Sequence, residues 1–131
     1  MLQRLKTRIL VIDDDPAVGV YLTRLLEETG RYSVEAEADS LIAMATARVF
    51  HPDLLFVDVF MPGRGGFELA EELRAEPRLR QCPIIFFTGK PIVGPPPGVI
   101  EGAAPMVYLA KGVSGDEIVE LVARLLPVPQ G

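Results

Sequence analysis

The sequence predicts an α/β protein with a doubly wound, five-stranded parallel sheet. Two short runs, residues 54–57 (LLFV) and 84–87 (IIFF), are apolar at every position, which is typical of strands buried on both faces. Segments with helical periodicity alternate with the predicted strands, which indicates parallel strands joined by right-handed helical crossovers. A length of 131 residues suits a single domain of this class.

The first predicted strand, residues 8–12, leads directly into a helix. Asp15 supplies a side-chain acceptor at the N-cap, and Pro16 suits the first helical position. Gly30 is placed to end this helix. Its apolar face is expected to consist of Val18, Leu22, Leu25 and Leu26.

A weak second strand at residues 32–36 precedes a second helix. Asp39 or Ser40 would cap this helix, and Pro52 would stop it one residue after His51. The residues expected to face inward are Leu41, Met44, Ala45 and Val49.

The central part of the chain predicts strands at residues 54–58 and 83–88, with a helix between them. Gly65 and Gly66 open that helix, and Pro77 ends it. Its apolar positions are Phe67, Leu69, Ala70 and Leu73, and its glutamates point outward.

The last strand is predicted at residues 106–110. A final helix begins at Ser114, with Glu117 three residues later as in a capping box. The first, third and fourth strands are the most apolar and should be central. The predicted strand order is therefore 2-1-3-4-5, which is the flavodoxin-like arrangement.

Composition excludes several classes of protein. The formal net charge of −5 argues against direct nucleic-acid binding, which needs a basic face. A single cysteine, Cys82, excludes an internal disulfide and fits a reducing, cytoplasmic setting. No apolar run is long enough to span a membrane.

Polar residues follow the predicted strands where each one ends. Asp13 and Asp14 follow the first strand, Asp58 the third, Thr88 the fourth and Lys111 the fifth. These ends share one edge of a doubly wound sheet, so the side chains should converge. Clustered carboxylates repel one another, and a hard cation such as Mg²⁺ would relieve the repulsion. With a lysine and a hydroxyl nearby, the set suits phosphoryl chemistry.

Four segments together resemble the receiver (CheY-like) domain of two-component response regulators. They are ILVIDDDP at residues 9–16, LLFVDVFMPG at 54–63, IIFFT at 84–88 and YLAK at 108–111. The resemblance extends from about residue 8 to residue 126, so residues 1–131 are expected to form one receiver domain.

The resemblance implies a role for each residue at the strand ends. Asp58 would be the phosphoacceptor, and Lys111 would hold a phosphoryl oxygen. Thr88 would turn toward the phosphoryl group. The metal ligands would be Asp13, Asp14, Asp58 and the backbone carbonyl of Phe60, and Tyr108 would be the aromatic switch residue.

The implied function is a phosphorelay switch. A sensor histidine kinase or a phosphotransfer protein would donate the phosphoryl group, and a downstream protein would read the changed surface. The domain would catalyse its own phosphorylation rather than turn over a substrate. The chain would be either a stand-alone receiver or a fragment of a larger regulator, since little sequence follows residue 126.

The sequence departs from the family pattern in two places. Gly112 replaces the usual proline after Lys111, so a cis bond is not expected there, but Lys111 should still point into the site. Residues 90–105 contain three consecutive prolines, Pro95, Pro96 and Pro97, where the family has a fourth helix. That helix is expected to be shortened or absent, with a remodelled output face.

Positions near the phosphoacceptor indicate how long a phosphoryl group would last. In the family, the positions of Phe60 and Lys90 modulate hydrolysis of the acyl phosphate. Neither side chain here suits the orientation of an attacking water, so a long-lived phosphoryl form is expected. Gly89 leaves the site open to partners.

Two other functions remain open at this point. The chain could be a constitutive interaction module that keeps the fold without phosphorylation control, as the altered segment at residues 90–105 would allow. It could instead be a Mg²⁺-dependent phosphatase or phosphotransferase for small molecules. Phe60 stands where a second acidic group of such an enzyme would be expected.

Overall fold

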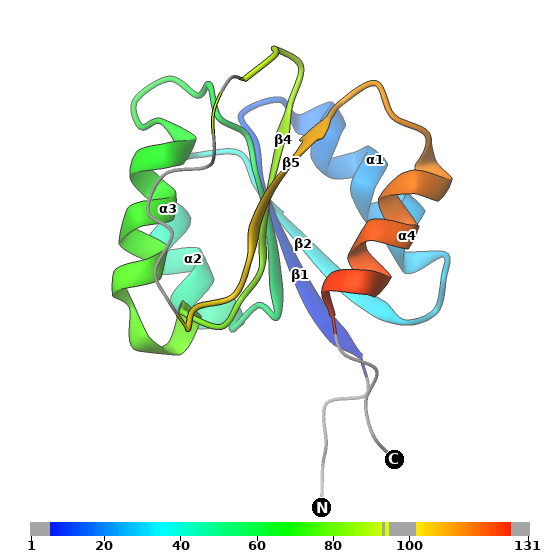
Figure 1. Cartoon of the computed structure of the whole chain (residues 1–131), viewed down its shortest axis with the longest axis horizontal. Coiled ribbons are helices and arrows are strands. Elements are labelled where there is room, and N and C mark those ends of the chain that lie inside the picture. Colours follow the sequence, from blue (N-terminus) through cyan, green and yellow to red (C-terminus); the bar gives the residue numbers. More distant parts are fainter. Residues whose placement is uncertain (1–5, 93, 95–101, 127–131) are drawn as a thin grey trace, which may run out of the picture.

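The computed structural model describes residues 6–92, 94 and 102–126, and within them the predicted fold class is confirmed. All strand pairs are parallel, in the order β2-β1-β3-β4-β5 (Figure 1). The elements are β1 (Thr7–Ile12), α1 (Pro16–Glu27), β2 (Tyr32–Glu37), α2 (Ala43–Phe50), β3 (Leu54–Val57), α3 (Gly66–Ala75), the 3₁₀ turn η1 (Pro77–Leu79), β4 (Ile84–Thr88), β5 (Met106–Ala110) and α4 (Gly115–Leu125).

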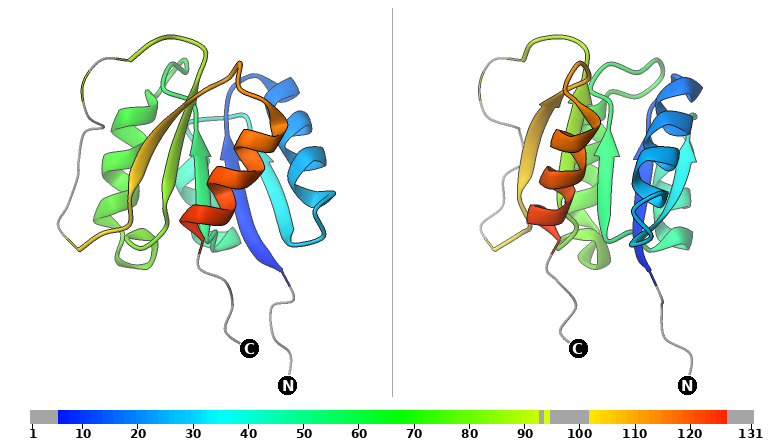
Figure 2. Two further views of the ribbon diagram at one scale, coloured as in Figure 1. Left: turned by 45° about the vertical axis from the view of Figure 1, so that its right-hand side comes forward. Right: turned by 90° about the vertical axis from the view of Figure 1, so that its right-hand side faces the viewer.

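Helices cover both faces of the sheet. Helices α2 and α3 lie on one face, and α1 and α4 lie side by side on the other (Figures 1 and 2). Alternate residues of each central strand therefore enter two separate cores, one on each face. Every residue of β3 and β4 is buried, which explains why all of them except Thr88 are apolar.

The predicted helix starts are confirmed for α1 and α4. Asp15 caps α1 by accepting a hydrogen bond from the N–H of Ala17, with Pro16 at the first position. Ser114 caps α4 by accepting from the N–H of Glu117. Both side chains accept from backbone N–H groups that have no partner within the helix.

The second helix differs from the prediction. Of the residues expected to face inward, Met44 is buried, whereas Ala45 is exposed and Leu41 and Val49 are 70% and 81% exposed. The buried residues of α2 are Ala43, Met44 and Ala47. The helix begins only at Ala43, so Leu41 lies before its first turn, and it has no side-chain cap. Two small alanines on the buried face let the helix lie close to the sheet.

Asp39 and Ser40 do not cap this helix, because both serve the turn that precedes it. Asp39 accepts a hydrogen bond from the N–H of Leu41 at 2.9 Å. The hydroxyl of Ser40 donates to the carbonyl of Pro62 at 2.9 Å. Ser40 therefore ties the start of α2 to the loop after β3.

The connection between β4 and β5 is described only at its two ends. Residues 89–92, 94 and 102–105 contain no helix and no strand. The prediction of a shortened or absent fourth helix depends mainly on residues 93 and 95–101, which lie outside the described residues. Across the described ranges, every helix is too short or too polar to span a membrane.

Candidate functional site

Asp13 and Asp58 lie side by side because they follow neighbouring strands in register. Ile12 pairs with Val57 in the β1–β3 ladder. The ladder continues one step further, since the N–H of Asp58 donates to the carbonyl of Ile12 at 2.9 Å. The carboxyl end of the sheet thus places both acids at one edge, as the sequence predicted.

Three carboxylates gather at this edge. One ligand atom from each of Asp13, Asp14 and Asp58 lies within 4.8 Å of the others. Asp13 and Asp58 are only 5% and 6% exposed, whereas Asp14 is exposed. One oxygen of Asp13 accepts a hydrogen bond from the N–H of Asp15 at 2.9 Å, which fixes the carboxylate in place.

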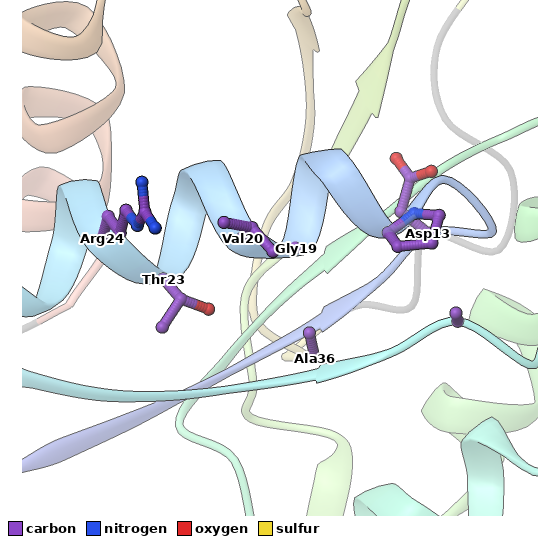
Figure 3. Close-up of a pocket in the computed structure, with 8 residues that line it drawn as sticks. Asp13, Gly19, Val20, Thr23, Arg24 and Ala36 are labelled. Carbon is purple, nitrogen blue, oxygen red and sulfur yellow. The ribbon is translucent and has the colours of Figure 1, made fainter.

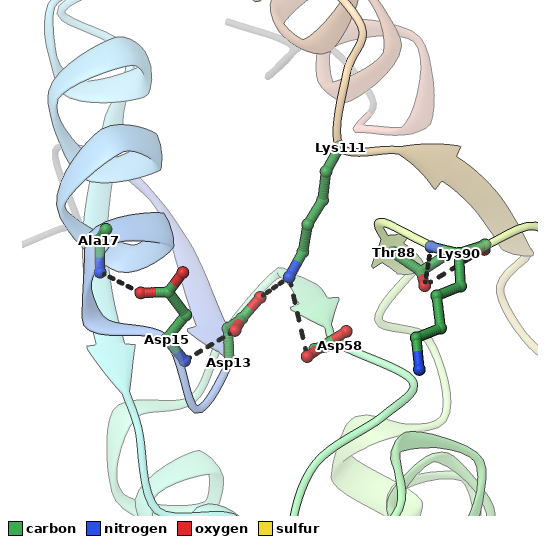
Figure 4. A network of polar contacts seen from close by, with 7 residues as sticks. All are labelled: Asp13, Asp15, Ala17, Asp58, Thr88, Lys90 and Lys111. Atoms are coloured by element: carbon green, nitrogen blue, oxygen red, sulfur yellow. Dashed lines mark hydrogen bonds and ion pairs between the residues drawn. The ribbon is translucent and has the colours of Figure 1, made fainter.

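Lys111 extends from the end of β5 into this acidic cluster (Figure 4). Its Nζ lies 2.9 Å from Oδ2 of Asp13 and 3.7 Å from Oδ2 of Asp58. All described peptide bonds are trans, including the one to Gly112, and Lys111 still points into the site as expected. One ammonium group therefore faces three carboxylates, which leaves an excess of negative charge.

The pKa values of Asp58 and Lys111 are both raised, for different reasons. Burial, together with the nearby charge of Asp13, raises the pKa of Asp58 to about 6, although Lys111 and the N–H of Phe60 lower it in part. Burial alone would lower the pKa of Lys111, but the hydrogen bond and charge of Asp13, with Asp58 and Asp15, raise it above its usual value.

The loop after β3 is held against Asp58 by a glycine. A Cβ at Gly66 would lie 2.1 Å from the carbonyl oxygen of Asp58 and 2.8 Å from Cα of Val59. The N–H of Gly66 donates to the carbonyl of Val59 at 2.9 Å. The first residue of α3, Gly66, therefore packs directly against the backbone of Asp58. The sequence showed Gly65 and Gly66 only as a helix start, and this contact was not foreseen.

Thr88 lies near the acidic cluster, but its hydroxyl is bonded elsewhere (Figure 4). The hydroxyl accepts from the N–H of Lys90 at 3.2 Å and donates to the carbonyl of Lys90 at 3.4 Å. The ammonium of Lys90 lies 4.9 Å from the centre of the Phe60 ring, a cation–π contact that joins the loops after β3 and β4.

Tyr108 packs on the α3 side of β5. Its ring centre lies 5.8 Å from that of Phe86 and 6.3 Å from that of Phe67. A cavity of about 300 Å³ lies beside it, lined by residues that include Thr88, Lys90 and Tyr108. There is therefore space between the two side chains that the sequence predicted as switch residues.

A separate groove of about 410 Å³ lies between α1 and β2 (Figure 3). It reaches Asp13 at one end, and Val20, Thr23 and Arg24 line its helical side. Asp14, Asp58 and Lys111 do not line it, so the groove and the acidic cluster have only Asp13 in common among these residues.

Comparisons with known proteins agree with this geometry. The family model of the response regulator receiver domain matches residues 9–123. The chain belongs to the response regulator receiver domain family. The receiver domain fold explains why the acids and the lysine, far apart in sequence, meet at one sheet edge.

Relatives with solved structures share the receiver fold closely. Chemotaxis protein CheY4 of Vibrio cholerae superposes with a TM-score of 0.78 at 25% identity, over 92% of this chain and 99% of that one. The receiver domain of sensor histidine kinase PA1611 from Pseudomonas aeruginosa superposes with a TM-score of 0.74 at 25% identity, over 92% of this chain and 97% of that one. That structure was solved with a magnesium ion coordinated in its active site cleft.

Among curated proteins, the DNA-binding dual master transcriptional regulator RpaA of Synechocystis is 32% identical over 121 residues. The match covers 91% of this chain and 48% of RpaA. The chain thus spans about half the length of the first curated relatives it matches. The receiver domain is the shared part, and it places the chain in two-component signalling.

Proposed function

We propose that this receiver domain accepts a phosphoryl group on Asp58 from the phosphohistidine of a sensor kinase or phosphotransfer protein, with Mg²⁺ as cofactor. The observation that carries the proposal is the cluster of Asp13, Asp14 and Asp58 around the ammonium of Lys111. The cluster is poised to bind cations and phosphoryl oxygens at the same edge.

The residues present fit a magnesium ion. Oδ2 of Asp13 is buried, and among the described groups only the ammonium of Lys111 faces it. Three carboxylates with one ammonium leave a site that favours a hard divalent cation with oxygen ligands. Asp13, Asp14, Asp58 and the Phe60 carbonyl would hold the ion. When bound, it would neutralise charge on the phosphoryl oxygens.

The side chains at this edge divide the work of phosphoryl transfer. A carboxylate oxygen of Asp58 forms a bond to phosphorus as the P–N bond of phosphohistidine breaks, and the bonding electron pair stays on the histidine nitrogen. Lys111 would move from the carboxylates to a phosphoryl oxygen. The remaining contribution is positioning, because the nucleophile is already fixed at the end of a buried strand.

Phosphorylation would then act on the side of the sheet that carries Thr88 and Tyr108. To donate to a phosphoryl oxygen, the Thr88 hydroxyl must give up the hydrogen bond that it donates to the carbonyl of Lys90. The cavity next to Tyr108 gives that ring space to follow. A small change at Asp58 would thereby alter the surface along β5, which a downstream protein would read.

The phosphoryl form is expected to decay slowly. Phe60 is half exposed, and the ammonium of Lys90 lies over the Phe60 ring. Neither side chain presents a carboxylate or amide to a water molecule near Asp58. Decay within minutes in Mg²⁺ alone, followed by intact mass, would contradict this expectation.

The proposal also includes the partners of the domain. A histidine kinase or phosphotransfer protein would be the donor and a protein the downstream target, in the cytoplasm. The net charge of −5 leads us to propose that residues 1–131, as a single domain, make no direct contact with nucleic acid. RpaA is a DNA-binding regulator, but the match covers only 48% of it.

Intact mass after incubation with Mg²⁺ and acetyl phosphate tests the proposal. We expect a gain of one phosphoryl group in the natural protein and in the exposed control Asp116→Asn. The gain should be absent in Asp58→Asn and absent without Mg²⁺. A folded natural protein that gains no mass would instead support a constitutive interaction module. Hydrolysis of phosphate esters with turnover would support a phosphatase.

A further inference from the structure

Arg74 is a charged side chain in an unusual place. It lies in the last turn of α3, is 1% exposed, and is the bulkiest of the fully buried side chains in the described part of the chain. Burial lowers the pKa of its guanidinium, and no carboxylate of the described residues forms an ion pair with it. A buried, unpaired cation is costly unless hydrogen bonds compensate it.

The compensating acceptors are all backbone carbonyls. Nη1 donates to the carbonyl of Leu79 at 3.1 Å, in the turn after α3. Nη2 donates to the carbonyls of Ala104 at 2.9 Å and Pro105 at 3.5 Å, immediately before β5. The planar fork of a guanidinium can bind several acceptors in fixed directions, which an ammonium cannot do.

The same short stretch before β5 makes three further hydrogen bonds. The N–H of Ala104 donates to the carbonyl of Arg80 at 3.1 Å, and the amide of Gln81 donates to the carbonyl of Gly102 at 2.8 Å. The carbonyl of Pro105 also accepts from the N–H of Ile84 at 3.0 Å. This stretch has no helical hydrogen bonds of its own, so its backbone groups depend on these partners.

We propose that Arg74 is a conformational anchor that fixes the start of β5 to α3. Strand β5 is at the edge of the sheet and pairs only with β4, so its position depends on how its start is held. The strand carries Tyr108 and leads into Lys111. At the other end of α3, Gly66 packs against the backbone of Asp58. One helix thus contacts both the loop of Asp58 and the strand that leads to Lys111.

Amide hydrogen exchange by NMR tests the anchor in the unphosphorylated protein, so the result does not depend on the chemistry of Asp58. The reporter is the amide of Ala104, and the reference is the central strand β1. In Arg74→Met, we expect exchange at Ala104 to become at least tenfold faster relative to β1. Arg74→Lys should give a smaller increase, because an ammonium can still bind some of the carbonyls, although fewer than a guanidinium binds. The exposed control Arg78→Met should change the ratio less than twofold.

Two results would overturn the proposal. One is an unchanged exchange rate at Ala104 in both Arg74 variants. The other is an equal increase at Ala104 and β1, which would show that Arg74 only supports the stability of the whole domain. If Arg74→Met does not fold, Arg74→Lys alone decides between these results.

Discussion

The functional edge of the sheet has two sides that are built differently. On the acceptor side, after β1 and β3, Asp13 and Asp58 are buried, and backbone hydrogen bonds and the glycine contact at Gly66 fix their positions. On the switch side, after β4 and along β5, the Thr88 hydroxyl is held by two long hydrogen bonds, and Tyr108 lies half-buried beside a cavity.

This difference matches the separate tasks that we propose for the two sides. A site that binds a cation and a phosphoryl group gains from being rigid, because no reorganisation is needed at the moment of reaction. A surface that reports the reaction must have a second arrangement available at small cost. Lys111 joins the two sides, since it extends from β5 and contacts both Asp13 and Asp58.

Removing one charge from the acceptor side should have the largest effect on the binding of Mg²⁺. Asp14→Asn leaves the exposed member of the cluster in place but neutral, so Mg²⁺ affinity should fall about tenfold to 100-fold. Isothermal titration with MgCl₂ measures this. Asp39→Asn, an exposed acid away from the cluster, is the control. Equal affinity in Asp14→Asn and the natural protein would show that Asp14 is not a ligand.

Gly66→Ala should distort the acceptor side at the backbone of Asp58. The added Cβ would meet the carbonyl of Asp58, so we expect the free energy of unfolding to fall by about 3 kcal/mol. Gly65→Ala is a matched control, because a Cβ there has no neighbour closer than 3.8 Å. Urea denaturation of both variants decides the point, and similar losses at the two positions would refute the special role of Gly66.

The raised pKa of Asp58 predicts a dependence of stability on pH. Because its pKa is about 6 in the folded state and 3.8 when unperturbed, the folded protein holds the proton more tightly between these values. Stability should therefore fall as the pH rises from about 4 to about 6, by about 2–3 kcal/mol. Asp58→Asn should lack this fall. Denaturation curves without divalent cations test it, and an identical slope in both proteins would contradict it.

The smallest change is expected on the switch side. Thr88→Ala should lower the free energy of unfolding by about 1 kcal/mol or less, since the two bonds to Lys90 are long. It should still accept a phosphoryl group, but the NMR signals of Tyr108 should no longer shift on addition of beryllofluoride and Mg²⁺. Thr88→Ser keeps the hydroxyl and should keep the shift. Equal shifts in both variants would show that the Thr88 hydroxyl is not needed for the change at Tyr108.

The sequence predicted that Asp13 and Asp58 would meet at one edge of the sheet, and the structure places them there. Each acid directly follows an apolar strand, and strand order alone brings Asp13 and Asp58 together. The start of α2 was predicted too early, because Asp39 and Ser40 are used in the preceding turn and the helix begins only at Ala43.

Other features could not be predicted because their partners are backbone atoms far away in sequence. Arginine is normally exposed, and nothing near Arg74 in the sequence indicates that carbonyls 30 residues later would surround it. The close contact of Gly66 with Asp58 likewise depends on the angle at which α3 leaves the loop. A pattern of residue types carries no information on either distance.

The most direct test of the account locates the phosphoryl group itself. The protein is incubated with acetyl phosphate and Mg²⁺, reduced with borohydride to convert an aspartyl phosphate into homoserine, and mapped by peptide mass spectrometry. The account predicts homoserine at position 58 alone. Homoserine at position 13 or 14 with Asp58 unmodified, or no homoserine in a folded protein, would contradict it.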